Sequence, residues 1–162
     1  PRKLGSAHPR NAPYQAYRAA DDWFAIAAGN DRLWQSVCEV VGAPEWANDP
    51  RFASTTQRAR NQAALKELLE ARFAGASAAD WLARFRVAGV PSAPINGYAE
   101  ALADPQAAHL GLVVPATLPG GHATRTVGCP VRLDGEAVEV DATFPALGEH
   151  TAALRSRMKE AT

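Results

Sequence analysis

The chain has 162 residues, 47% of them apolar, and its 17 lysines and arginines balance 17 aspartates and glutamates. This length supports one sizeable hydrophobic core without disulfides, and zero net charge gives no field that would attract nucleic acid or an anionic membrane. The two cysteines lack the spacing of a metal or redox motif, and no apolar run approaches the roughly 20 residues that span a bilayer, so we expect a cytoplasmic protein with free thiols.

The first part of the chain predicts an arm, a hairpin and a helix. Residues 1–13 contain three prolines and no apolar period, which indicates an extended linker arm. Two short runs rich in aromatic and apolar residues, 14–19 and 23–28, are typical of a β-hairpin. Asn30 is a favourable N-cap, and the apolar residues after it recur at helical spacing as far as Gly42.

The middle of the chain predicts two further helices and an extended stretch. A long amphipathic helix is expected over residues 54–73, followed by a second helix that Ser77 caps and Gly89 ends. Residues 90–95 contain two prolines, each of which pushes the residue before it out of the helical region, so this stretch is expected to be extended.

The last part mixes short helices and strands. Helices are expected over residues 97–103, 104–110 and 148–159, and strands over 112–117, 124–127 and 131–140, the last broken at Asp134-Gly135. The composition shifts near residue 111 from helix-rich to strand-rich. The expected class is therefore α+β, with a short antiparallel sheet packed by helices. Residues 1–13 form the arm, 14–111 a small domain, and 112–162 a strand-rich connection that ends in a helix.

A series of short motifs points to a family. The motifs, in chain order, are His8-Pro9, Ala12-Pro13-Tyr14, Gly29-Asn30, Asp49-Pro50-Arg51-Phe52, Arg60-Asn61, Trp81, Gly89-Val90-Pro91 with Ala93-Pro94, Asp104-Pro105-Gln106, Gly128-Cys129-Pro130-Val131 and Leu147-Gly148-Glu149-His150-Thr151. Each motif is weak alone, but their order resembles the C-terminal portion of class III CoA-transferases. This family includes formyl-CoA and carnitine CoA-transferases and α-methylacyl-CoA racemase.

The resemblance implies covalent catalysis by a carboxylate. A buried aspartate attacks an acyl-CoA thioester, a mixed anhydride and then an aspartyl-CoA thioester form, and a second carboxylic acid collects the CoA. The aspartate and the Rossmann-like half that binds CoA would lie outside this chain, and residues 112–162 would return to that large domain. Because the chain begins at Pro1 and Met158 is its only methionine, we expect a fragment. Without the family's nucleophile we expect it to be inactive alone. The family also implies an interlocked homodimer and no cofactor, with coenzyme A as a substrate.

Four residues are candidates for a place near the active site. His8, Tyr14 and Gln15 lie where transferase members carry a segment that approaches the cleft, although the glycine-rich form of that segment is absent here. At the position of Asn30 the racemase branch has a glutamate that exchanges the α-proton. An amide cannot do so, which favours transfer. Ordinary roles stay open for all four: a loop histidine, two strand residues and a helix cap.

Other functions also stay open. The chain could be a non-catalytic binding or assembly module of the same ancestry, or part of a racemase-like isomerase. No residue of this chain is expected to be catalytic itself. No metal site is expected, because His109 and His122 have no second ligand at metal spacing. The expected partners are an acyl-CoA, a carboxylic acid and a second copy of the chain.

Overall fold

The computed structural model describes residues 3–139 and 142–160, and the chain divides into two compact units, Pro1–Ile95 and Asn96–Thr162. The division falls before residue 111, where the composition shifts. The two short helices that precede residue 111 are joined to the strand after it, since Leu112 N donates to Ala107 O at 3.0 Å. The expected α+β class with short antiparallel sheets is confirmed.

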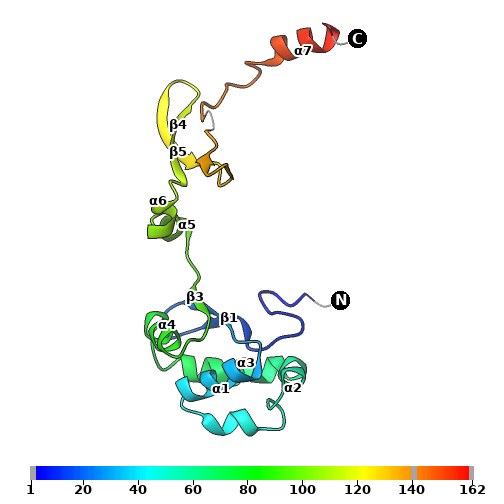
Figure 1. The fold of residues 1–162 in the computed structure, drawn as a ribbon, viewed down its shortest axis with the longest axis vertical. Helices are drawn as coiled ribbons and strands as arrows, with labels where there is room; N and C mark the ends of the chain where they lie inside the picture. The colour runs from blue at the N-terminus through cyan, green and yellow to red at the C-terminus, as the bar shows by residue number, and fades with distance from the viewer. Residues whose placement is uncertain (1–2, 140–141, 161–162) are drawn as a thin grey trace. The chain divides into compact units, whose positions relative to one another are not determined.

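The first unit combines a three-stranded sheet with helices (Figure 1). Its elements are β1 (Tyr14–Arg18), β2 (Trp23–Ala27), α1 (Asp31–Val40), the 3₁₀ helix η1 (Pro44–Asn48), α2 (Thr55–Arg60), α3 (Gln62–Phe73), α4 (Ala78–Val87) and β3 (Ser92–Pro94). The strands are antiparallel in the order β1-β2-β3. The predicted hairpin is confirmed, with Tyr14 paired to Ala27 and Arg18 to Trp23. The extended stretch after α4 supplies the third strand.

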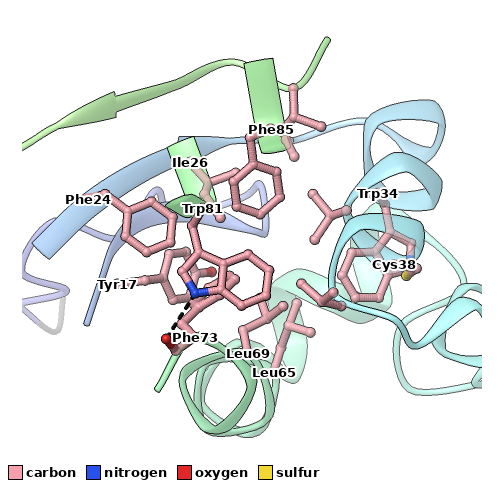
Figure 2. Packing of buried hydrophobic residues seen from close by; sticks show 14 of the residues in the cluster. Tyr17, Phe24, Ile26, Trp34, Cys38, Leu65, Leu69, Phe73, Trp81 and Phe85 are labelled. Carbon is pink, nitrogen blue, oxygen red and sulfur yellow. Dashed lines mark hydrogen bonds between the residues drawn. The ribbon is translucent and has the colours of Figure 1, made fainter. Parts of the chain in front are cut away.

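The core lies on the sheet face that the helices cover. Alternate residues of a strand share a face, and the buried side chains of β1 and β2 include Tyr17, Phe24 and Ile26. Figure 2 shows their side chains gathered with the rings of Phe73 and Trp81. The ring centroid of Phe73 lies 5.0–6.0 Å from those of four other aromatic side chains, and its carbonyl accepts the Trp81 indole N–H at 2.9 Å. One aromatic cluster therefore joins the sheet to α3 and α4.

The prediction of one long helix over residues 54–73 is wrong, because α2 and α3 are separate helices that meet at Asn61. The Asn61 backbone leaves the helical region, with φ −102° and ψ 25°, and its side-chain amide donates to the carbonyls of Gln57 and Arg51, both at 3.0 Å. Asparagine favours such local bonds over a continuous helix. Asn61 thus ends α2 and fastens it to the preceding turn.

Residues 3–13 differ from the free linker expected for this segment. Ala12 is fully buried, and the carbonyl of Pro13 accepts from Ala28 N at 2.8 Å. Farther back, Gln62 Nε2 donates to His8 O at 3.1 Å. Side-chain and backbone bonds therefore fix this segment against β2 and α3.

The second unit consists of short elements. They are α5 (Tyr98–Leu102), α6 (Pro105–His109), β4 (Val113–Leu118), β5 (His122–Val127), β6 (Arg132–Leu133), β7 (Glu136–Ala137) and α7 (Thr151–Glu160). Two antiparallel hairpins result, β4-β5 and β6-β7, as the predicted breaks indicated. Asp134 and Gly135 both have positive φ, which suits the tight turn between β6 and β7. The expected strand end at Val140 lies outside the described residues. Ala116 is the buried apolar residue of this unit within the described ranges.

Candidate functional site

The sheet face opposite the helices carries an open groove, here called the sheet groove. Its volume is about 370 Å³. It is lined by Ser6, Tyr14, Gln15, Ala16, Ala25, Ile26, Ala27, Pro91, Ser92, Ala93 and Ile95. The pairs Tyr14–Ala27, Ala16–Ala25 and Ala25–Ala93 lie side by side across the three strands. Small side chains therefore form an apolar floor, and larger ones stand at its edges.

Tyr14 and Gln15 both border the sheet groove, but their side chains differ in role. The Tyr14 side chain is 43% exposed, as befits a residue on the open face. The Gln15 side chain is buried, and its amide nitrogen donates to the Tyr17 hydroxyl at 3.2 Å. Residues two apart on a strand share a face, so the Gln15 amide lies with Tyr17 on the core side. Tyr14 is the better candidate for contact with a ligand in the groove.

His8 is held beside Tyr14 by a ring stack and a backbone hydrogen bond. Their rings are stacked, with centroids 5.2 Å apart and planes 12° apart, and His8 N donates to Tyr14 O at 2.9 Å. The His8 Nδ1 atom accepts from the backbone N–H groups of Arg10 and Asn11, at 3.2 and 3.1 Å. An Nδ1 that accepts two N–H bonds leaves the proton of the neutral ring on Nε2. His8 therefore presents a hydrogen-bond donor at Nε2.

Asn30 caps α1, as the sequence predicted. Its Oδ1 accepts from Leu33 N at 2.8 Å, and its side chain is exposed. The residue before it, Gly29, lies directly against Asn11: a Cβ atom on Gly29 would be 3.0 Å from Asn11 Cβ. The turn that carries Asn30 and the segment that carries His8 and Tyr14 therefore touch each other.

Arg58 is a buried charge that bonds to both of these segments, and the sequence prediction missed it. Its side chain is fully buried, and its guanidinium donates to Ala12 O at 2.7 Å, Phe52 O at 3.0 Å and Asp31 Oδ1 at 2.8 Å. The available signal was its position seven residues before buried Leu65, which places a charged residue on the apolar face of the helical pattern.

The positive charge of Arg58 affects the ionisation of the neighbouring carboxylate. The hydrogen bond from Arg58 holds the pKa of the Asp31 carboxyl below its ordinary value, so Asp31 is ionised near neutral pH. The described residues that line the sheet groove include no carboxylate, thiol or imidazole. Across the described ranges, no three His, Cys, Asp or Glu side chains gather as a metal site requires. In the same ranges, no helix has the length and apolar character to cross a membrane.

A comparison with known protein families identifies the chain. The profile of CoA-transferase family III matches residues 1–151. The chain belongs to this family. The resemblance drawn from the short motifs is therefore confirmed, and the matched residues include all four candidates.

Individual members of CoA-transferase family III are similar over almost the whole chain. The acetyl-CoA:oxalate CoA-transferase of Acetobacter aceti is 38% identical over 156 residues, which are 96% of this chain and 39% of that protein. The succinyl-CoA:glutarate CoA-transferase of Mus musculus is 32% identical, over 93% of this chain and 34% of that protein. The chain thus spans less than two fifths of the length of these relatives.

A solved structure shows the same fold. The CAIB/BAIF family protein from Brucella suis aligns with a TM-score of 0.75 and 37% identity. The alignment covers 97% of this chain and 40% of that one. A fold similar to that of this chain is therefore present within that longer protein.

Proposed function

We propose that this chain is the C-terminal part of an acyl-CoA:carboxylate CoA-transferase, with the catalytic aspartate and the CoA-binding half outside it. The observation that carries the proposal is the family match over residues 1–151, together with relatives that are named as CoA-transferases and are more than twice as long. The substrates would be an acyl-CoA and a carboxylic acid, without a further cofactor.

The residues of the sheet groove fit a role in binding the substrate rather than in attacking it. Family catalysis needs a carboxylate that attacks the thioester carbonyl and releases the CoA thiolate, which then attacks the enzyme carbonyl of the anhydride and releases the first acid. The acceptor acid attacks the resulting enzyme thioester and releases the thiolate again, and the thiolate takes the acceptor's acyl group and restores the enzyme carboxylate. The lining of the sheet groove provides no such carboxylate among the described residues. It provides an apolar floor, the Tyr14 ring and, beside that ring, the Nε2–H of His8. We propose that these groups shape the site and orient the substrate.

The test compares two proteins: the 162-residue chain and the product of the complete reading frame. Each is incubated with acetyl-CoA or succinyl-CoA as donor and oxalate or glutarate as acceptor, and the exchanged CoA thioesters are separated by chromatography. We expect transfer by the longer protein, and neither transfer nor a hydroxylamine-trapped acyl adduct with the chain alone. An aspartyl or glutamyl adduct on the chain alone would contradict the proposal, and so would a longer protein that transfers CoA between no tested pair.

We also propose that the protein works as a homo-oligomer in the cytoplasm. The second unit exposes many large apolar side chains, among them Leu133 (65% exposed), Leu154 (56%) and Met158 (73%). Large apolar side chains that are this exposed are candidates for a protein interface. This feature also favours the alternative, a non-catalytic assembly module. Sedimentation of the longer protein together with the transfer assay separates the two: an active oligomer supports the enzyme, and an inactive protein that binds a separate transferase subunit supports the module.

A further inference from the structure

We propose that Arg58 is a positioning residue that holds together the two segments on which the candidate site stands. One segment runs from His8 to Gln15, and the other is the turn that ends in Asn30. The consequence for catalysis rests on the proposed function, whereas the structural coupling does not. Arg58 touches none of the reacting groups itself, so its effect passes through the atoms that it holds.

The contacts of Arg58 reach both segments at once. On one side its Nε donates to the carbonyl of Ala12 at 2.7 Å, two residues before Tyr14. On the other side its second terminal nitrogen donates to Asp31 Oδ1 at 2.8 Å, directly after Asn30. The remaining terminal nitrogen donates to Phe52 O at 3.0 Å. A single guanidinium thus bonds to three parts of the chain that are distant in sequence.

The burial of Arg58 fixes the positions of the groups that accept its hydrogen bonds. The Arg58 side chain has no exposed surface, and a buried charge is tolerated only when it is paired and hydrogen-bonded. The nitrogen that donates to Asp31 also donates to Thr55 Oγ1 at 3.2 Å. The donors of the guanidinium point in fixed directions within one plane, so the four acceptors must keep their places around it. An ammonium group on a flexible stem cannot reproduce that planar geometry. Replacement by lysine therefore frees at least one of the segments.

The two segments are packed closely, so neither can move far without disturbing the other. A Cβ atom on Gly29 would lie only 3.0 Å from Asn11 Cβ, which is closer than an ordinary van der Waals contact. A backbone bond, from Ala28 N to Pro13 O at 2.8 Å, joins the same segments at their base. Arg58 adds a second tie at Ala12, on the side toward His8. A movement of Ala12 would therefore disturb the stacking of His8 on Tyr14.

The first experiment reads this stacking directly by NMR on the 162-residue chain. Protons of the His8 ring lie over the Tyr14 ring and should resonate upfield of those of an exposed histidine. They are assigned by their loss in a His8→Gln variant. In Arg58→Lys we expect the upfield shift to fall by more than half while the contacts between Tyr17 and Phe73 persist. The control is Arg60→Lys, which makes the same change at an exposed position of α2. A folded Arg58→Lys protein with the wild-type His8 shift would overturn the proposal.

A second variant decides the matter if Arg58→Lys does not fold. Asp31→Ala removes the exposed partner of the guanidinium and leaves its bonds to the buried carbonyls in place. We expect a smaller but measurable loss of the His8 shift, because Asp31 bonds to the guanidinium that holds Ala12. The control is Asp49→Ala, which removes a different carboxylate–guanidinium pair, the one with Arg51. Identical His8 shifts in Asp31→Ala and wild type would contradict the coupling.

The catalytic consequence is measured separately in the product of the complete reading frame. There Arg58→Lys should lower kcat/KM for CoA transfer about 10- to 100-fold, as expected when a substrate-positioning segment moves by an ångström or less. Arg60→Lys should stay within about twofold of wild type. A longer protein without any transferase activity would count against the proposed function alone, since the NMR result would still stand. Unchanged kinetics with a disturbed His8 would overturn the catalytic part of the inference.

Discussion

Asp31 is the partly exposed carboxylate that pairs with the buried Arg58 guanidinium. This pairing predicts that the stability of the fold depends on pH. The pKa of Asp31 in the folded state lies below the ordinary value of 3.8, because Arg58 hydrogen-bonds to the carboxylate. Such a group stabilises the fold above the pKa of the unfolded chain, and the contribution is lost as pH falls through the lower folded pKa. The affected window therefore lies below about pH 4.

The Asp31→Asn variant tests this dependence, since asparagine keeps an acceptor oxygen and removes the charge. Near pH 7 the variant should be less stable, by about 1 kcal/mol, because the Asp31 side chain is 62% exposed and solvent screens its interaction with the buried Arg58 guanidinium. Below the folded pKa of Asp31 the two proteins should approach equal stability. Urea unfolding at both pH values measures this, and a difference that persists in acid would show that the charge is not its cause.

The two cysteines differ in environment and should differ in reactivity. Burial raises the pKa of the Cys38 thiol to about 12, whereas Cys129 is partly exposed. The thiolate is the reactive form, so a neutral disulfide reagent should label Cys129 in the native chain and Cys38 only after unfolding. The native Cys129→Ser variant should then show no rapid labelling. Rapid reaction of two thiols in the native wild type would contradict the burial of Cys38.

At the residue scale, side chains that act on their own neighbours in sequence were predictable, and those that act across the fold were not. The caps of α1 and α4, Asn30 and Ser77, could be read from residue type and the helical pattern that follows each. Arg58 bonds to Ala12 across 46 residues, and no local pattern reveals such a partner. The burial of Gln15 on the core side became clear only from the pairing of β1 with β2.

The Ser77 side chain caps the start of α4. Removing its hydroxyl should therefore lower the stability of the fold measurably. The Ser77 hydroxyl accepts from Asp80 N at 3.1 Å and donates to Asp80 Oδ2 at 2.7 Å. Ser77→Ala leaves these groups without their partner and should lower the free energy of unfolding by about 0.5–2 kcal/mol. Ser36→Ala is the control, because Ser36 lies inside α1 and makes a single long bond of 3.5 Å to Arg32 O. Equal effects of the two substitutions would show that Ser77 is not acting as a cap.

The elements themselves were predictable where pattern and stop signals agreed. Two runs rich in aromatic and apolar residues predicted β1 and β2, and glycines marked the ends of α1 and α4. The prediction failed over residues 54–73, because apolar spacing continues across Asn61 while the backbone does not. The break depends on side-chain bonds from Asn61 to Gln57 and to Arg51 in the preceding turn, and the latter is a tertiary contact.

Phe73 joins several elements of the first unit, so its removal should affect the whole unit. Its ring contacts Tyr17 on β1, Phe24 on β2 and Trp81 on α4. Phe73→Ala should cost about 3–5 kcal/mol, a large share of the stability of a small domain. Phe144→Ala, at a site that is 43% exposed, is the matched control and should cost far less. Thermal unfolding by circular dichroism compares them, and similar melting temperatures would contradict a core centred on Phe73.

For the whole protein, the amide at Asn30 predicts transfer rather than isomerisation. Its Oδ1 is occupied by Leu33 N, so in this structure the residue caps a helix and offers no acid or base. We expect the product of the complete reading frame to transfer CoA without exchanging the α-proton of a 2-methylacyl-CoA, and deuterium incorporation from heavy water measures the exchange. Asn30→Asp keeps an equally good cap and adds a carboxylate. If capping α1 is the only role of Asn30, this variant should fold, transfer CoA and still show no exchange of the α-proton. Rapid exchange by the wild type would move the protein to the racemase branch, whereas exchange gained only by Asn30→Asp would place Asn30 beside the bound substrate.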